Sequence, residues 1–207
     1  MNIAVLAANG RTGSEFVRAA LAHGHTVRAG VHGKHRFKPH ERLTIVDCDA
    51  TNPDEVINLL TTCEAVASFI GHVRGSAPVV QSNAIDTLIA AMQQLEITRV
   101  VSLTGTGVRQ PGDNITLLDR VLNLSISIID PARVKDGIHH AEILKDSKLE
   151  WTIIRVLKLQ KVPKRPYQLL KNGPTKPYVG RREVAEAALE VLENHTFVRE
   201  MPIIANK

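Results

Sequence analysis

The chain has 207 residues, of which 43% are hydrophobic and 3% aromatic, and its formal net charge at pH 7 is +5. This length suits one α/β domain with an aliphatic core, and the small charge excess does not indicate nucleic-acid binding. No apolar run has the length of a membrane span, and the N-terminal run is too short for a signal peptide, so we expect a cytoplasmic protein. The two cysteines, Cys48 and Cys63, form no zinc or disulfide motif, and no metal site is expected.

The first half of the chain alternates aliphatic runs with helical patterns. Buried strands are predicted at residues 2–8, 26–31, 43–46, 65–70 and 99–103, and helices at residues 14–22, from Pro53 onward and at residues 78–95. This alternation is typical of parallel strands that are joined by right-handed crossovers.

The second half adds two strands and one irregular segment. Helices are predicted at residues 116–124, 133–145 and 182–193, and strands at residues 151–157 and 201–205. Residues 158–180 carry four prolines and are expected to form a small cap on the substrate side. We therefore predict a Rossmann-type doubly wound α/β fold, with a mostly parallel sheet of six to seven strands and helices on both faces. Residues 1–207 would form a single domain.

The turn after the first predicted strand carries the glycine spacing of a dinucleotide site. It reads Ala7-Ala8-Asn9-Gly10-Arg11-Thr12-Gly13 and leads directly into the first predicted helix. A pyrophosphate needs exposed backbone N–H groups at a helix N-terminus; Gly10 permits that approach, and Gly13 permits close packing of the helix. Alanine at position 7 replaces the first glycine of the usual pattern. We expect the cofactor to be held by Ala7, Asn9, Gly10, Arg11, Thr12 and Gly13, the alternative being a tight turn in another kind of α/β protein.

The end of the second predicted strand favours NADP(H) over NAD(H). An NAD site typically has an acidic residue there, whereas this strand ends at His32 and leads into Lys34 and Arg36. Cations at this place suit a 2′-phosphate, because charge-assisted hydrogen bonds to phosphate oxygens are strong. His32, Lys34 and Arg36 are therefore predicted to bind the cofactor, with NAD(H) as the alternative because many surface loops are basic without binding a ligand.

With these motifs the chain resembles the atypical short-chain dehydrogenase/reductases, and in particular the NmrA-like and biliverdin-reductase-B (flavin-reductase)-like group of NAD(P)H-binding proteins. The turn AANGRTG is similar to the G-A-T-G-x-x-G of that group. Two further segments are similar to motifs of the group, Asp49-Ala50-Thr51 and Phe69-Ile70-Gly71. The resemblance implies that Asp49 and Ala50 lie near the adenine and that Ile70 and Gly71 lie against the adenosine ribose.

The Tyr-x-x-x-Lys pair of many short-chain dehydrogenases is absent from the expected helix. If Glu142 is the acid that often follows this pair, Val134 and Ile138 stand at the Tyr and Lys positions. A Tyr-x-x-x-Lys sequence does begin at Tyr167, but it follows the sixth predicted strand and belongs to the wrong side of the fold. Carbonyl chemistry that depends on this pair is therefore not expected.

The candidate catalytic residues are Thr104, Lys135 and His139. Thr104 ends the fifth predicted strand and can hydrogen-bond a substrate or the cofactor's carboxamide, or simply satisfy backbone groups. Lys135 and His139 are four residues apart on a predicted helix and so share one face, which is either a catalytic or a solvated one. Arg155 ends the sixth strand, where open α/β sheets bind ligands, and is predicted to contact cofactor or substrate.

Three functions are compatible with these residues. The first is an NAD(P)H-binding oxidoreductase that reduces a flavin, a quinone or a similar conjugated acceptor, because such a reaction needs mainly orientation over the nicotinamide. The second is a non-catalytic NADP(H)-sensing regulatory protein of the NmrA-like type with a protein partner, and the third is a sugar-nucleotide epimerase-like enzyme. A small-molecule substrate is expected in the first case, and the oligomeric state is left open as monomer or homodimer.

Overall fold

The computed structural model describes residues 1–73, 75–160, 165–176 and 178–207 and contains an eight-stranded sheet with the order β3-β2-β1-β4-β5-β6-β10-β8. All pairings in this sheet are parallel except that of β8 with β10. The predicted Rossmann-type α/β fold is confirmed. The strands of the sheet are β1 (Asn2–Leu6), β2 (Thr26–Val31), β3 (Leu43–Asp47), β4 (Ala65–Ser68), β5 (Arg99–Gly105), β6 (Glu150–Val156), β8 (Tyr167–Leu170) and β10 (Ile203–Asn206).

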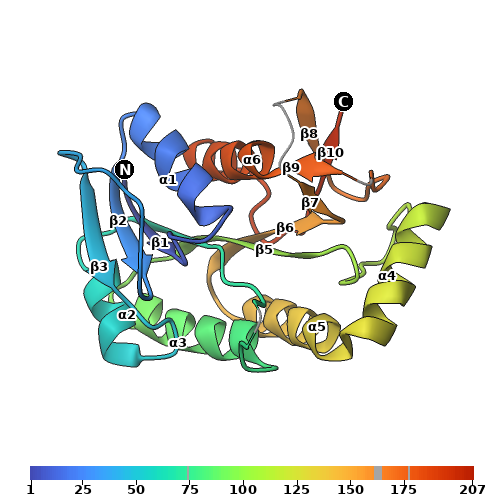
Figure 1. Ribbon diagram of the computed structural model, residues 1–207, viewed down its shortest axis with the longest axis horizontal. Helices are drawn as coiled ribbons and strands as arrows, with labels where there is room; N and C mark the ends of the chain where they lie inside the picture. The colour runs from blue at the N-terminus through green and yellow to red at the C-terminus, as the bar shows by residue number, and fades with distance from the viewer. Residues whose placement is uncertain (74, 161–164, 177) are drawn as a thin grey trace.

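Helices cover both faces of the sheet (Figure 1). In chain order they are α1 (Gly13–Ala22), α2 (Pro53–Leu60), α3 (Val80–Gln94), α4 (Leu117–Ile129), α5 (Pro131–Asp146) and α6 (Arg181–Glu193). Figure 1 shows α1 and α6 on one face, α2, α3 and α5 on the other, and α4 at the end of the molecule beside α5. Each face has its own largely aliphatic core, and this is why residues 3–6 of β1 and residues 65–67 of β4 are continuous apolar runs with no polar alternation.

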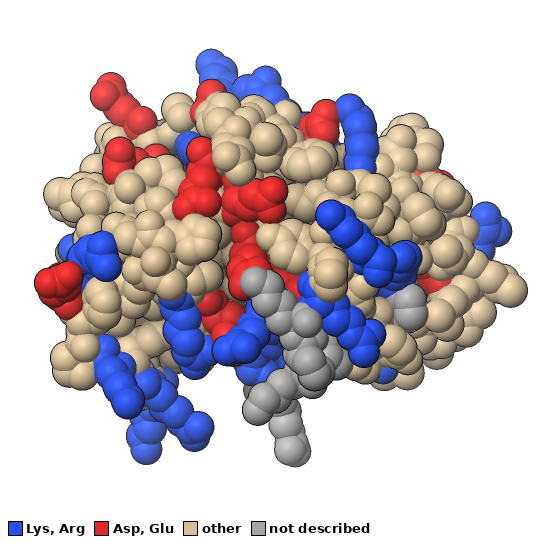
Figure 2. All heavy atoms as spheres, turned by 90° about the horizontal axis from the view of Figure 1, so that it is seen from above, with Lys and Arg blue, Asp and Glu red and all other residues tan. Residues whose placement is uncertain are grey.

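Figure 2 views the face that carries α1 and α6. Acidic side chains lie in the middle of this face, and basic side chains lie mostly around its rim.

The prediction of six to seven strands was too low because the segment after β6 is not a simple loop. Its residues 167–170 form β8, which pairs antiparallel with β10 and places Leu169 against the core. Two shorter strands, β7 (Leu159–Gln160) and β9 (Val179–Gly180), pair with each other nearby. Residues 161–164 and 177 lie outside the described residues, so the cap over residues 158–180 stays a prediction.

The glycine turn brings α1 into direct contact with the end of β1. Ala7 has φ +53°, a left-handed conformation that favours glycine, at the place where the usual motif has its first glycine. The Gly10 N–H donates to the Ala7 carbonyl at 2.9 Å. A Cβ atom on Gly13 would lie 2.3 Å from the same carbonyl oxygen and 3.0 Å from Ala8 Cα, so only glycine fits at position 13.

The substitution Gly13→Ala tests this contact. Both neighbours of the added methyl group belong to the backbone, so α1 has to move, and we expect a loss of roughly 1–3 kcal/mol in the free energy of unfolding. The matched control is Gly71→Ala, because a Cβ there has no neighbour within 4 Å. Urea unfolding curves measure both, and equal midpoints for the two variants would contradict the close contact.

Candidate functional site

A pocket of about 590 Å³ opens at the carboxyl edge of the parallel strands. Its wall is built from the glycine turn, from the segments that follow β4, β5 and β6, and from side chains of α4 and α5. Open α/β sheets bind ligands at this edge. Five predicted site residues line this one pocket, namely Arg11, Thr12, Ile70, Gly71 and Thr104.

The glycine turn and the basic loop after β2 are linked through Asn9. Its side-chain amide donates to the carbonyls of His32 at 3.1 Å and Lys34 at 3.0 Å. His32, Lys34 and Arg36 are exposed, and among the described residues none of them forms an ion pair. The predicted phosphate-binding loop is therefore next to the turn, and its cations are accessible.

On the side predicted for the adenine, Asp49 has a local structural role. Its Oδ1 accepts hydrogen bonds from the backbone N–H of Thr51 at 2.9 Å and from the Thr51 hydroxyl at 2.7 Å. The backbone hydrogen bond, followed by the hydroxyl, lowers the pKa of Asp49 below its ordinary value, so the carboxylate stays charged. Ala50 is half-buried and packs on the same core as Ile70. The contact of Asp49 and Ala50 with adenine stays a prediction.

Arg155 does not reach the pocket, and the predicted contact with cofactor or substrate has to be corrected. Its side chain is fully buried, and its guanidinium donates to Asp113 Oδ1 at 2.8 Å, to the Met201 carbonyl at 2.7 Å and to the Val108 carbonyl at 3.1 Å. Arg155 therefore ties the segment after β5 to β6 and to the chain before β10. The position at a strand end was predicted correctly, but the burial of the side chain excludes a direct contact with a ligand.

Lys135 and His139 also lie away from the pocket. Both are exposed on α5, and His139 pairs with Glu142 at 3.6 Å. The face of α5 that lines the pocket carries Arg133, Val134 and Gly137 instead. The two predicted residues do share one face, as expected from their spacing, but it is the solvated face.

Thr104 lies at the pocket wall as predicted. It is 7% exposed, and its hydroxyl lies 3.0 Å from the position that a Cβ on Gly137 would take. Glycine at position 137 thus lets α5 pack directly against the end of β5. The catalytic role of Thr104 stays a prediction.

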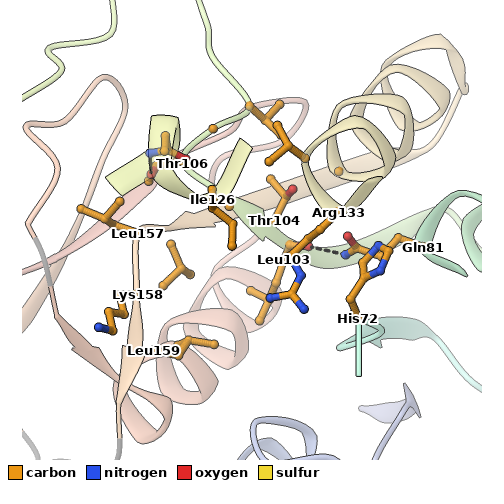
Figure 3. A pocket seen from close by; sticks show the side chains of 18 of the residues that line it. His72, Gln81, Leu103, Thr104, Thr106, Ile126, Arg133, Leu157, Lys158 and Leu159 are labelled. Carbon is orange, nitrogen blue, oxygen red and sulfur yellow. Dashed lines mark hydrogen bonds between the residues drawn. The ribbon is translucent and has the colours of Figure 1, made fainter. Parts of the chain in front are cut away.

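Four cations line the pocket, and no carboxylate does so among the described residues. Arg11 belongs to the glycine turn and Arg181 to the first turn of α6, and burial, followed by repulsion from Arg11, lowers the pKa of Arg181. Figure 3 shows the other two cations on different sides of the pocket, with Arg133 towards Leu103 and Gln81 and Lys158 beside the apolar Leu157 and Leu159. The pocket therefore combines apolar walls with a positive electrostatic potential, which favours anionic ligands.

Sequence reasoning missed a histidine that is paired with a carboxylate at this pocket. His72 follows β4 and lines the pocket, and its Nε2 lies 2.8 Å from Asp136 Oδ2 on α5. Asp136 also accepts hydrogen bonds from the backbone N–H groups of Gln81 at 2.8 Å and Ser82 at 3.0 Å, and from the Ser82 hydroxyl. Burial alone would raise the pKa of Asp136, but these hydrogen bonds lower it below its ordinary value. The two partners are 64 residues apart, and no local pattern connects them.

The glycine turn between the first strand and the first helix, together with a pocket at the carboxyl edge of a parallel sheet, defines a Rossmann-type dinucleotide-binding protein. Glycine is required at position 13, and a Cβ on Gly10 would lie only 3.0 Å from the Ala7 carbonyl, so the turn fits a closely approaching pyrophosphate. The model of a family described as NAD(P)H-binding matches residues 7–195. The chain belongs to this NAD(P)H-binding family.

Solved structures show the same fold at low sequence identity. A short-chain dehydrogenase/reductase from Veillonella parvula, in complex with NADP, is 21% identical with a TM-score of 0.80, covering 99% of this chain and 94% of its own. The oxidoreductase ylbE from Lactococcus lactis is 16% identical with a TM-score of 0.83, covering 100% and 91%. A protein from Streptococcus pneumoniae with the provisional name NADH-flavin reductase is 20% identical with a TM-score of 0.79, covering all of both chains.

No curated protein matches the sequence. In the part of the chain that the structure describes, His, Cys, Asp and Glu side chains form no group of three or more suited to a metal ion. None of the described helices is long and apolar enough to span a membrane.

The substitution Asp113→Asn tests the buried pair with Arg155. It leaves the guanidinium without its counter-ion, and the expected loss at neutral pH is about 3–5 kcal/mol in the free energy of unfolding. Burial would raise the pKa of Asp113, but hydrogen bonds from Arg155 and from the Gln110 N–H lower it below its ordinary value.

Because the pKa of Asp113 is lowered in the folded state, the difference in unfolding free energy between wild type and Asp113→Asn should depend on pH. Its stabilisation is fully present above the pKa of an unfolded aspartate, about 3.9, and is lost as the pH falls through the lower pKa of the folded state. We expect the gap between wild type and Asp113→Asn to shrink in this acidic range, as measured by urea unfolding at several pH values. The exposed Asp86→Asn serves as the control, and a gap that is independent of pH would contradict the ion pair.

Proposed function

We propose that the protein is an NADPH-dependent reductase that acts on a conjugated, negatively charged acceptor such as a flavin phosphate. The observation that supports this most directly is the pocket, which has apolar walls and four cations and lies between the glycine turn and Thr104. Bound NADPH would supply the hydride. The chain itself would bind the pyrophosphate at Gly10 and Gly13 and orient the acceptor between α4, α5 and residues 156–159.

The absence of the Tyr/Lys pair supports an acceptor of this kind. Val134, at the expected Tyr position, is an apolar part of the pocket wall. The Tyr-x-x-x-Lys sequence that begins at Tyr167 lies outside the pocket. Its Tyr167 hydroxyl donates to Glu190 at 3.0 Å, and its Lys171 pairs with Glu200 at 2.6 Å. A conjugated acceptor can delocalise the charge that hydride delivers, and it depends less on such a pair than an isolated carbonyl does. The same absence weakens the epimerase-like alternative.

A non-catalytic NADP(H) sensor is the second candidate, and α4 is the feature that favours it. Leu122, Ile126 and Ile129 of this helix line the pocket. The same helix exposes other large apolar side chains, with Leu124 at 64% and Ile128 at 73% exposure. A helix that touches both the ligand pocket and an exposed apolar surface could couple ligand binding to a protein partner. This hypothesis predicts NADPH binding without turnover of any acceptor.

The preference for NADPH can be tested at the basic loop. In the double variant Lys34→Gln/Arg36→Gln, we expect the Kd for NADPH to rise about 10- to 100-fold, because charge-assisted hydrogen bonds to the 2′-phosphate are lost. NADH is the matched control ligand because it has no 2′-phosphate, and its Kd should stay nearly constant. Isothermal titration calorimetry measures both values; an equal weakening for both ligands would show that the loop does not bind the 2′-phosphate.

The charge of the acceptor can be tested with FMN and riboflavin, which differ only in a phosphate group. For Arg133→Gln we expect kcat/KM for FMN to fall about tenfold, the equivalent of one charge-assisted contact of about 1.4 kcal/mol, while the value for riboflavin changes little. Arg120→Gln, an exposed residue of α4 that does not line the pocket, is the control. Equal losses for both flavins would contradict a role of Arg133 in binding the phosphate.

A further inference from the structure

His72 lines the pocket, and the proposed function described above gives this side chain no role. Only 7% of its side chain is exposed, and Figure 3 shows the ring beside Gln81 at the pocket wall. Its Nε2 is occupied by Asp136, whereas its Nδ1 has no hydrogen-bond partner among the described residues. An imidazole held through one nitrogen, with the other nitrogen available, has the arrangement of a general acid or base.

Asp136 is bound in a way that keeps it charged and fixed. Its side chain is fully buried, and it sits at the N-terminus of α3, where Gln81 and Ser82 donate three hydrogen bonds to it. Backbone N–H groups and the helix dipole stabilise an anion at this place. The carboxylate therefore orients the His72 ring through Nε2, as a carboxylate orients the histidine of a catalytic triad.

Among the described residues, the groups around this pair leave His72 as the candidate proton donor. In that part of the chain, the α3 side contributes the neutral Gln81 and Ser82, and the α5 side contributes Asp136 and the cation Arg133, which lines the same pocket. A second titratable neighbour of Asp136 is His140, which is hydrogen-bonded to Ser102 at 2.9 Å. Burial lowers the pKa of His140 to about 4, so it stays neutral near pH 7.

We infer that His72, positioned by Asp136, is the catalytic acid that protonates the acceptor during its reduction. This inference rests on the proposed reductase function. One atom of the acceptor gains hydride, which carries two electrons, and the negative charge that develops on the conjugated system takes the proton from His72 Nδ1. The N–H bond of His72 breaks, a new bond to hydrogen forms on the acceptor, and His72 is left neutral. It then regains a proton from solvent, so that one turnover consumes NADPH and one proton.

The test compares two acceptors that differ in their need for a proton. Menadione, a neutral quinone, takes hydride and a proton, whereas the N-methylacridinium cation is neutralised by hydride alone. For His72→Gln we expect menadione turnover to fall roughly 100-fold, the lower end for a general acid, while acridinium turnover falls less than about threefold.

A matched control is available at the surface. His195 also pairs with a carboxylate, Glu150 at 3.6 Å, but it is 57% exposed and does not line the pocket. Since its φ is +52°, the suitable replacement is His195→Asn, which tolerates that backbone conformation. This variant should keep wild-type turnover with both menadione and acridinium.

Asp136 acts through His72, and its test is the same comparison of acceptors. In Asp136→Asn the ring loses the carboxylate that orients it, so we expect menadione turnover to fall while acridinium turnover changes little. A measurement independent of turnover uses protein labelled with ¹⁵N-histidine, with His72 assigned by its absence in His72→Gln. We expect the Nε2–H group of His72 to be hydrogen-bonded to Asp136 in wild type and to lose this hydrogen bond in Asp136→Asn. A His72 signal that is identical in the two proteins overturns the inference.

The possible outcomes separate this inference from the function on which it rests. If wild type oxidises NADPH with menadione, FMN and acridinium at no more than background rates, both proposals fail. If wild type is active and His72→Gln lowers turnover with menadione and with acridinium equally, or with neither, the proposed reductase function stands and His72 is not the acid. A loss confined to menadione supports the inference.

Discussion

The close contact between α1 and the end of β1 is the constraint on which the rest of the site depends. Gly13 packs where any side chain would meet the Ala7 carbonyl, and Ala7 accepts a left-handed backbone to turn the chain. This contact holds the N-terminus of α1 at the carboxyl edge of the sheet, beside the segments that follow β4 and β5. The same edge therefore presents backbone N–H groups to an anion and an open pocket next to them.

Buried carboxylates hold the other walls of this pocket without lining it. Asp113 ties the segment after β5 to Arg155 of β6, and Asp136 joins α5 to the N-terminus of α3. Because both acids face inward and are paired, the described surface of the pocket carries cations, neutral polar groups and apolar groups but no carboxylate. The positive potential of the pocket thus follows from the inward pairing of these carboxylates as well as from the cations themselves.

The fold could be predicted because its rules are local: an aliphatic run, a turn and an amphipathic helix repeat along the chain, and parallel pairing follows. The glycine turn is equally local, and its residues lie where expected. Lys135 and His139 were misplaced because a helix advances 100° per residue, so their spacing fixes a shared face but not its direction. Arg155 was misjudged because its partner, Asp113, comes from a distant loop. His72 and Asp136 meet only through the packing of α3 and α5, which no sequence pattern contains.

Under the proposed function, the arrangement of the pocket gives a physical reason why the Tyr/Lys pair would be dispensable. In a carbonyl reaction, hydride and proton go to adjacent atoms, so the acid must lie within hydrogen-bond reach of the carbonyl oxygen and close to the nicotinamide. In a conjugated acceptor the charge spreads over the ring system, so the proton can be delivered to an atom well away from the one that receives hydride. An acid at the α3 side of the pocket, the role inferred for His72 beside Asp136, would meet that requirement, and Val134 at the expected Tyr position would offer an apolar surface to the ring.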